Sequence, residues 1–335
     1  MQYIFVVLFS LIVELRGAFS WILKHSVPPS SLFPRRRESY LFLSSNPSKE
    51  ESNSDSPRLV ILIPAYNEES RIESTLKSYQ DFLLCSSSHD TTNTNYPSFR
   101  DPEIVVVDDG SKDSTLEVVQ NFPAKIPIRA VALEENCGKG AALARGIRDI
   151  LDASHTHSIK NFTDDTYILT QDADGSGDLI YLNIMLNKLR KLSSFEIDRM
   201  KNGTIGQGLV IGNRNYELFT PRGITRWGFQ TCVRIITSNS LRVKDSQCGY
   251  KLMTLGTAKL LYENLHLKGW SHDVEVLFRA NLLNIPIDEV AIDWEDKDGS
   301  KVTESGVVKV SIQMLYDVLR LRWNYSIQKS WKLDL

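Results

Sequence analysis

The chain has 335 residues, of which 42% are hydrophobic and 24% charged, and its formal net charge is −2. This length accommodates one large α/β domain or two smaller ones. The near-neutral balance argues against a protein that coats nucleic acid, because such proteins usually carry a strong basic excess. The four cysteines are far apart and form no Cys-x-x-Cys pair. Reduced thiols in a cytosolic compartment are therefore expected, in place of disulfides or a zinc site.

The N-terminus carries an apolar segment, residues 3–23, about as long as a helix that crosses a bilayer. Glu14 and Arg16 interrupt it, and a signal peptide or an interfacial helix are competing interpretations. Positive charge follows the segment, most clearly at the arginines of residues 35–37. A membrane-anchor helix is predicted over residues 1–24, and the positive-inside rule places its N-terminus outside and the bulk of the protein in the cytosol.

After the predicted anchor, regular structure is predicted to resume at residue 58. Residues 25–57 are rich in serine and proline and lack apolar periodicity, which predicts a flexible linker. Residues 58–302 are predicted to form the folded domain. In its first half, short apolar runs that suit buried parallel strands alternate with helical patterns. These runs lie at residues 60–63, 103–107, 128–132 and 166–170.

The alternation predicts an α/β fold whose central sheet is mostly parallel and flanked by helices. Polar clusters follow the first, second and fourth of the predicted strands. Ligands of such sheets bind outside the carboxyl ends of the strands, so the clusters are expected to line one crevice. Their members are Tyr66, Asn67, Glu68, Asp108, Asp109, Asp172 and Asp174.

The second half of the domain is less regular, with a strand predicted at residues 208–214 and a helix near residues 222–242. Residues 303–335 are predicted to form a C-terminal amphipathic helical segment. This segment either packs on the domain or lies in a membrane interface, and the sequence leaves both open. Its apolar stripe consists of Val308, Ile312, Leu315, Leu319 and Trp323.

The acids of residues 171–179 (QDADGSGDL) indicate a cation. The segment imitates the start of a calcium loop, but Asn183 stands where that loop needs a glutamate, and a strand precedes it, so an EF-hand is rejected. A strand-terminal Asp-x-Asp suits Mg²⁺ or Mn²⁺, which take one or two carboxylates and complete their shell with water and phosphates. A solvated turn is the alternative for this motif taken alone.

A glycine-rich stretch, NCGKGAALARG at residues 136–146, fits neither the P-loop nor the dinucleotide-binding pattern. A nucleotide hydrolase or a Rossmann dehydrogenase is therefore disfavoured. Gly138 and Gly140 would still let the backbone approach a ligand, and Lys139 could reach a phosphate.

Short motifs that are weak individually become specific as an ordered series. In chain order they are IPAYNEE (63–69), VVVDDGSKDST (105–115), NCGKGAALARG (136–146), QDADG (171–175), IGNR (211–214), DSQCGYKL (245–252), WSHDVEVL (270–277) and IPIDEVAIDWEDKDGSKV (285–302).

Over residues 58–302 this series resembles the inverting, nucleotide-sugar-dependent glycosyltransferases of the GT-A fold. Within that family, the last three motifs and the apolar N-terminus look like the enzymes of the endoplasmic reticulum that glucosylate dolichyl phosphate. The chain departs from the family pattern at residues 175–178 (GSGD), where relatives vary. Asp178 has no matched role and is expected to cap the next helix.

The resemblance implies transfer of glucose from UDP-glucose to dolichyl phosphate with inversion, giving dolichyl β-glucosyl phosphate, a donor for N-glycan precursor assembly, and UDP. It implies that Asp172 and Asp174 hold Mg²⁺ or Mn²⁺ on the diphosphate, with Asp174 the surer ligand. Arg214 is expected to hold the acceptor phosphate. Asp273 is expected to act as a base or as a ligand of a sugar hydroxyl. A strong base is not required, because a phosphate monoester is already largely dianionic near neutral pH.

Other contacts are carried over by resemblance or by proximity. Arg222 and Arg226 are candidates for the acceptor phosphate only because they follow Arg214, and a solvated helix face is the alternative. Asp108 either contacts the donor or orients its loop. The remaining donor contacts implied are Pro64, Tyr66, Glu68, Asp109 (on the uracil) and Lys139.

The implied protein is a single-pass enzyme of the endoplasmic reticulum membrane with a cytosolic catalytic domain, and its oligomeric state is left open. One alternative is a sibling enzyme that uses GDP-mannose. Another is a catalytically silent, membrane-tethered binding protein of the same fold. A lumenal enzyme is a third, because residues 161–163, 202–204 and 324–326 are glycosylation tripeptides. The arginines of residues 35–37 and the cytosolic supply of nucleotide sugars favour the cytosolic orientation.

Overall fold

The computed structural model of the protein describes residues 56–87, 97–156, 166–199, 206–214, 221–237, 243–294 and 307–333. The predicted anchor over residues 1–24 and nearly all of the predicted linker lie outside these residues. Every described residue belongs to one compact unit, Glu51–Leu335. None of the described helices is both long and apolar enough to cross a membrane.

The central sheet has seven strands in the order β3-β2-β1-β4-β6-β5-β7. All neighbouring pairs are parallel except those made by β6, which runs antiparallel to both β4 and β5. The predicted mostly parallel sheet is therefore confirmed. The strands are β1 (Arg58–Ala65), β2 (Arg100–Asp108), β3 (Ile128–Ala132), β4 (Thr166–Thr170), β5 (Leu209–Arg214), β6 (Lys251–Thr254) and β7 (Ile287–Ile292).

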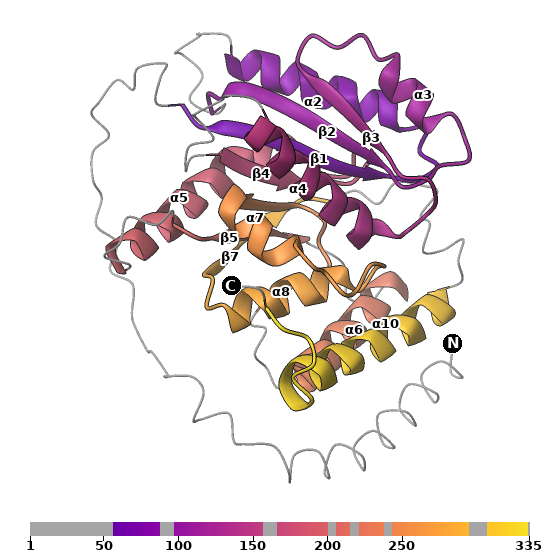
Figure 1. Cartoon of the computed structure of the whole chain (residues 1–335), viewed down its shortest axis with the longest axis vertical. Coiled ribbons are helices and arrows are strands. Elements are labelled where there is room, and N and C mark those ends of the chain that lie inside the picture. Colours follow the sequence, from indigo (N-terminus) through magenta and orange to yellow (C-terminus); the bar gives the residue numbers. More distant parts are fainter. Residues whose placement is uncertain are drawn as a thin grey trace. The chain divides into compact units, whose positions relative to one another are not determined.

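Helices cover both faces of the sheet (Figure 1). The longer ones are α2 (Ile72–Ser87), α4 (Lys139–Thr156), α5 (Leu182–Arg199), α6 (Pro221–Ile236), α8 (His272–Leu282) and α10 (Val307–Arg322). Shorter ones are α3 (Thr115–Gln120), η2 (Leu179–Tyr181), α7 (Leu255–Tyr262) and the π-helical turn η3 (Trp323–Ile327).

The alternation of side chains along β1 explains why the sheet needs helices on both faces. Leu59, Ile61 and Ile63 are fully buried in one core cluster with residues of α2 and α5. Leu62 points to the other face, where it meets Gly146 of α4 so closely that an added Cβ would lie 2.4 Å from it. A continuous apolar run in the sequence thus indicates a strand with helices packed on both of its faces.

Several local predictions can be compared directly with these elements. The helix expected near residues 222–242 is α6, which ends at Ile236. Asp178 caps η2 as predicted, since its side chain accepts a hydrogen bond from the Ile180 backbone N–H at 3.0 Å. Helix α8 and strand β7 have no counterpart among the predicted elements.

Candidate active site

The carboxyl ends of β1, β2 and β4 meet at one edge of the sheet. In the registers of these parallel pairs, Ala65 lies beside Asp108, and Leu62 lies beside Thr170. The polar residues that follow the three strands therefore share an edge, as the alternation of strands and helices predicted.

Asp172 follows β4 and is held by a lysine from the start of α4. Lys139 Nζ donates a hydrogen bond to Asp172 Oδ1 at 2.5 Å. Burial by itself would raise the pKa of Asp172, but the charge and hydrogen bond of Lys139 outweigh it, so the pKa is lowered. Burial would likewise lower the pKa of Lys139, but the attraction of Asp172 and Asp273 raises it. Both groups are therefore charged at neutral pH.

Gly249 provides the space in which the Asp172 carboxylate lies. A Cβ at position 249 would stand 2.7 Å from Oδ1 and 3.0 Å from Oδ2 of Asp172. The glycine of the DSQCGYKL motif is thus explained by the close approach of this carboxylate to the backbone before β6.

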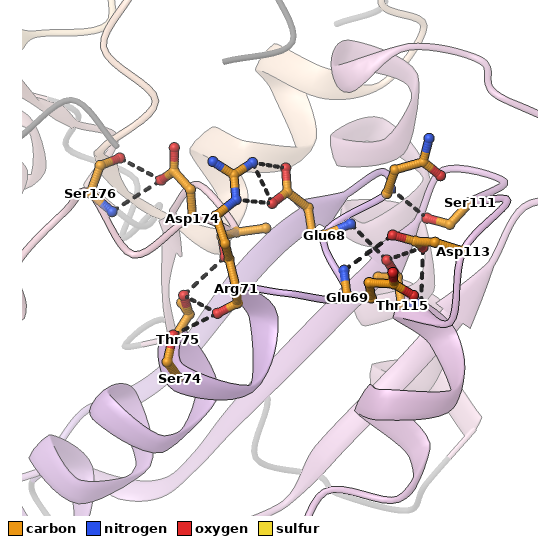
Figure 2. A network of polar contacts seen from close by, with 12 residues as sticks. Glu68, Glu69, Arg71, Ser74, Thr75, Ser111, Asp113, Thr115, Asp174 and Ser176 are labelled. Atoms are coloured by element: carbon orange, nitrogen blue, oxygen red, sulfur yellow. Dashed lines mark hydrogen bonds and ion pairs between the residues drawn. The ribbon is translucent and has the colours of Figure 1, made fainter. Parts of the chain in front are cut away.

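Asp174 lies in a loop that is fixed by its own turn and by α2 (Figure 2). Its Oδ1 accepts hydrogen bonds from the backbone N–H of Ser176 at 3.0 Å and from Ser176 Oγ at 2.5 Å. Thr75 Oγ1 of α2 donates to the carbonyl of Ala173 at 2.9 Å. Gly175, between Asp174 and Ser176, has φ +70°, the left-handed conformation that favours glycine. The second acid is therefore held in a defined place.

The acids retain oxygens that could bind a metal ion. Within the described part of the chain, Oδ2 of Asp172 and Oδ2 of Asp174 accept no hydrogen bond. No three His, Cys, Asp or Glu side chains gather there as a metal site. Mg²⁺ and similar ions are commonly bound by one or two carboxylates together with substrate phosphates. The residues present fit such an ion, with the substrate supplying the remaining ligands.

Asp109 organises the glycine-rich loop that leads to Lys139. Its two carboxylate oxygens accept hydrogen bonds from the backbone N–H groups of Cys137 and Gly138, both at 2.8 Å. Burial raises the pKa of Asp109, although these two hydrogen bonds oppose that rise. Gly138 has φ +97°, and a Cβ there would lie 2.6 Å from the carbonyl oxygen of Lys268. Asp108, which precedes Asp109, is also buried, and the Oδ1 atom of Asp108 has no hydrogen-bond partner among the described residues.

The loop after β1 is held by a bidentate ion pair. Arg71 donates from Nε and Nη2 to the two carboxylate oxygens of Glu68, each at 2.7 Å (Figure 2). The backbone N–H of Glu68 donates to Thr115 Oγ1 at 2.7 Å, which ties this loop to the start of α3. Tyr66 is half-buried at the same edge, and Pro64 belongs to β1 itself. Three of the residues predicted to contact the sugar donor, Pro64, Tyr66 and Glu68, therefore lie at the end of β1, with Glu68 paired to Arg71.

Arg214 ends β5 and pairs with a fully buried acid of the DSQCGYKL motif. Its Nε and Nη2 donate to Asp245 at 2.6 and 2.9 Å, which leaves Nη1 outside this pair. The guanidinium also lies 5.3 Å from the ring centroid of Trp294. The charge of Arg214 acts on Asp172, whose pKa it helps to lower. Arg214 is therefore a second cation, besides Lys139, whose charge acts on Asp172.

Arg222 and Arg226 lie in the first two turns of α6, and their side chains lie outside the described parts of the structure. Their predicted contact with the acceptor stays a prediction.

Asp273 lies in a buried charged cluster at the start of α8. Lys251 Nζ donates to its Oδ1, and His272 Nε2 lies 3.2 Å from the same oxygen. Burial alone would raise the pKa of Asp273, but His272 and Lys251 outweigh it and hold the pKa far below its usual range. A general base works best with a pKa near the operating pH, so this environment disfavours that role. The other predicted role, a ligand of a sugar hydroxyl, stays a prediction.

Sequence reasoning missed the partners of these residues. Asp245 and Lys251 belong to the DSQCGYKL motif, but neither residue was assigned a role. Both are almost completely buried. Charged side chains are rarely buried without a partner, but only the fold shows which partner each one meets.

The fold is a GT-A-like α/β fold. It is similar to the crystal structure of glucosyl-3-phosphoglycerate synthase from Mycobacterium tuberculosis in complex with Mn²⁺, UDP and glucosyl-3-phosphoglycerate. That likeness has a TM-score of 0.52 at 18% identity, covers 79% of this chain and 80% of the other, and concerns the fold alone. Glycosyl transferase family 2 matches residues 60–245. The chain belongs to this family and is a glycosyltransferase.

Its sequence is also similar to curated proteins named dolichyl-phosphate β-glucosyltransferase. The one from Dictyostelium discoideum is 34% identical, covering 83% of this chain and 78% of the relative. The one from Homo sapiens is 30% identical, covering 90% and 86%. The one from Saccharomyces cerevisiae is 30% identical, covering 80% and 75%. The resemblance read from the motifs is thereby confirmed over most of the chain.

Proposed function

We propose that this glycosyltransferase transfers glucose from UDP-glucose to dolichyl phosphate with inversion, giving dolichyl β-glucosyl phosphate and UDP. The observation that carries the proposal is the pairing of Asp172 with Lys139 beside Asp174, at the edge where β1, β2 and β4 end. The acceptor is supported by the names of relatives in several organisms. The donor is supported by a structural neighbour whose complex contains Mn²⁺, UDP-glucose and phosphoglyceric acid.

The donor would lie along the edge from Tyr66 to Asp174. Asp109 holds the backbone of the glycine-rich loop, so that Lys139 points into the acid pair. Asp172 and Asp174 would hold a divalent ion, Mg²⁺ or Mn²⁺, together with the donor diphosphate, since each has a carboxylate oxygen that accepts no hydrogen bond within the described part of the chain. Such an ion neutralises the charge that builds on the leaving diphosphate. Lys139 adds a second positive charge beside the same group.

The acceptor needs positive charge more than it needs a base. A phosphate monoester has a second pKa of about 6, so it is already largely dianionic at neutral pH. The lowered pKa of Asp273 is consistent with a site that does not remove a proton. Arg214 Nη1, the nitrogen outside the Asp245 pair, is the proposed donor to the acceptor phosphate. Positioning of two charged reactants is then the main catalytic contribution of these side chains.

We place the enzyme in the endoplasmic reticulum membrane as a single-pass protein with its catalytic domain in the cytosol, where its product serves N-glycan precursor assembly. The supports are the apolar segment at residues 3–23 and the arginines at residues 35–37.

The test is sugar transfer to dolichyl phosphate by the full chain in detergent, with labelled UDP-glucose or GDP-mannose and with or without Mn²⁺ or Mg²⁺. We expect transfer from UDP-glucose and none from GDP-mannose. This transfer should require the metal ion and should be abolished by Asp174→Asn. Transfer from GDP-mannose alone would overturn the donor. Donor binding without transfer to lipid would overturn the acceptor and the role of Arg214.

A further inference from the structure

Helix α10 has two apolar faces, and the described residues of the protein cover only one of them. The covered face consists of buried residues, and the helix packs on α6 and α8 (Figure 1). Its members are Met314, Leu315, Val318 and Leu321. This packing decides between the two interpretations of the C-terminal helix only in part, because it leaves the second face unexplained.

The second face carries large apolar side chains in water. Ile312, Tyr316 and Trp323 are 56%, 60% and 47% exposed. Residues separated by four, seven and eleven positions share one side of a helix, so these three lie on one stripe with the partly buried Leu319. We call these four residues, Ile312, Tyr316, Leu319 and Trp323, the α10 stripe.

The neighbouring helix exposes further residues of the same kind. Trp227 and Ile235 of α6 are exposed, and so is Ile327 in the turn that follows α10. Aromatic residues with apolar bodies and polar tips are typical of surfaces that meet both hydrocarbon and water. A single exposed apolar residue needs no explanation, but a run of them on two packed helices indicates a binding surface.

The sequence segments that form α6 and α10 are basic, although the whole chain has a net charge of −2. Between residues 307 and 333 the only acid is Asp317, and residues 221–236 contain no acid. Asp317 is already engaged, accepting hydrogen bonds from Ser271 Oγ at 2.8 Å and from Gln313 at 3.0 Å. The basic residues of these two segments are Arg222, Arg226, Arg234, Lys309, Arg320, Arg322, Lys329 and Lys332.

We propose that the α10 stripe docks on the surface of an anionic lipid bilayer. An interfacial helix presents a Trp- and Ile-containing face to the acyl boundary and basic residues to the headgroups, which is the pattern found here. Each Lys or Arg near an anionic surface contributes about 1 kcal/mol, so the basic excess selects anionic lipid over neutral lipid. The inference rests on the proposed function in one respect, that the acceptor is a membrane lipid.

Helix α10 also contacts the segment that leads into the candidate active site. The Ser271 hydroxyl that binds Asp317 directly precedes His272 and Asp273. Trp270, on the other side of Ser271, has its ring 5.9 Å from Lys139 Nζ. A docked α10 would therefore hold the loop beside Lys139 close to the headgroups, where an acceptor phosphate on a lipid would be presented.

The test is hydroxyl-radical footprinting of the full chain in lipid vesicles, read by mass spectrometry at Tyr316 and Trp323. Phosphatidylcholine vesicles are compared with vesicles that also contain phosphatidylserine. We expect the oxidation rates of both residues to be about fivefold lower with phosphatidylserine, which corresponds to the contribution of one basic residue near the surface. Raising the salt concentration should restore the rates, because the attraction is screened within about 10 Å at 0.1 M salt.

A variant pair separates docking from general effects of surface charge. Ile312→Asp should raise the oxidation of Tyr316 and Trp323 with phosphatidylserine to the level seen without it. Ile184→Asp is the matched control, because Ile184 is 52% exposed on α5 and should leave both rates unchanged. A thermal unfolding curve for each variant checks that the fold is retained.

Other occupants of the stripe give different results. Equal protection in both vesicle types and in lipid-free amphipol would mean that residues 1–55 or a second copy cover the stripe, and would overturn the proposal. Absence of protection would overturn it as well. Glucose transfer measured in the same vesicles keeps the two proposals apart. Protection of Tyr316 and Trp323 without glucose transfer would support docking and overturn the proposed function. Glucose transfer without protection would support the proposed function and overturn docking.

Discussion

The Nζ atom of Lys139 lies 2.5 Å from Oδ1 of Asp172, so the first residue of α4 brings a positive charge to the first of the two acids after β4. Asp109 fixes this arrangement by binding the two backbone N–H groups that precede Lys139. The result is a charged pair at the sheet edge with one carboxylate oxygen of Asp172 left over. A diphosphate with its cation could use both members of such a pair.

Replacing Lys139 by methionine should abolish most of the transfer activity. Removing one preorganised positive group from the place where charge develops typically costs about 10²–10³ in kcat. The measurement is kcat and KM for the donor with purified full chain. Lys112→Met is the control, because Lys112 is exposed on the loop before α3 and should keep wild-type kinetics. A Lys139→Met enzyme with unchanged kcat would contradict the role given to this lysine.

Replacing Gly249 by alanine should displace the Asp172 carboxylate without unfolding the protein. The new Cβ would stand 2.7 Å from Oδ1, a distance that real Cβ contacts do not reach, so the carboxylate must move. We expect transfer to fall by about 10²-fold, because misplacement by about 1 Å costs that much. Gly256→Ala is the matched control, since nothing lies within 4 Å of its added Cβ. Equal loss of activity in both variants would contradict the argument.

Much of the sheet could be predicted from the sequence, because strands covered on both faces read as continuous apolar runs. β1 and β2 are examples, and the acids that follow β2 and β4 lie at the predicted edge. Helix α8 could not be predicted in the same way. Its first turn contains His272, Asp273 and Glu275, which look like surface residues in sequence and are buried in the structure.

The candidate site shows the same division. Arg214 was expected from its motif, but its partner Asp245 is 31 residues away, and no spacing rule connects them. Lys251 reads as the solvent side of a strand, yet it is buried against Asp273. Which buried charges pair is decided by the tertiary fold, so the sequence indicates candidate residues without indicating their contacts.

The Arg214–Asp245 pair should contribute strongly to stability. Asp245 has a fully buried side chain, and removing one member of a buried pair leaves the other charge uncompensated. Asp245→Asn should therefore lower the free energy of unfolding by about 3–5 kcal/mol. The measurement is urea unfolding followed by tryptophan fluorescence in one detergent. Asp288→Asn removes the exposed partner of Lys188 and should cost less than about 1 kcal/mol.

A double variant tests whether the cost comes from the stranded charge. Arg214→Met combined with Asp245→Leu removes both charges and should be more stable than Asp245→Asn alone, since apolar replacements of buried pairs are often tolerated. It should nevertheless be inactive, because it lacks the Arg214 guanidinium. A double variant as unstable as the single one would mean that the pair is not the source of the stability.

Glu275 should make the stability of the protein depend on acid pH. Its side chain is fully buried and accepts hydrogen bonds from the backbone N–H groups of His266 and Leu267 and from the Tyr325 hydroxyl. Burial alone would raise the pKa of Glu275, but these hydrogen bonds, the contact with the His266 ring first among them, outweigh burial and lower it.

The sign of the effect follows from this lowered pKa. The unfolded chain has a Glu pKa of about 4.3, so the stabilisation by Glu275 is fully present above that pH. It is lost as the pH falls through the lower pKa of the folded state. Urea unfolding at pH 7 and at stepwise lower pH should show that Glu275→Gln is less stable than wild type at pH 7 and loses less stability on acidification. The exposed Glu117→Gln should match wild type at every pH. Parallel curves for wild type and Glu275→Gln would exclude Glu275 as a source of acid sensitivity. Asp113, Asp172 and Asp273, whose pKa values are also lowered, would then be left to account for it.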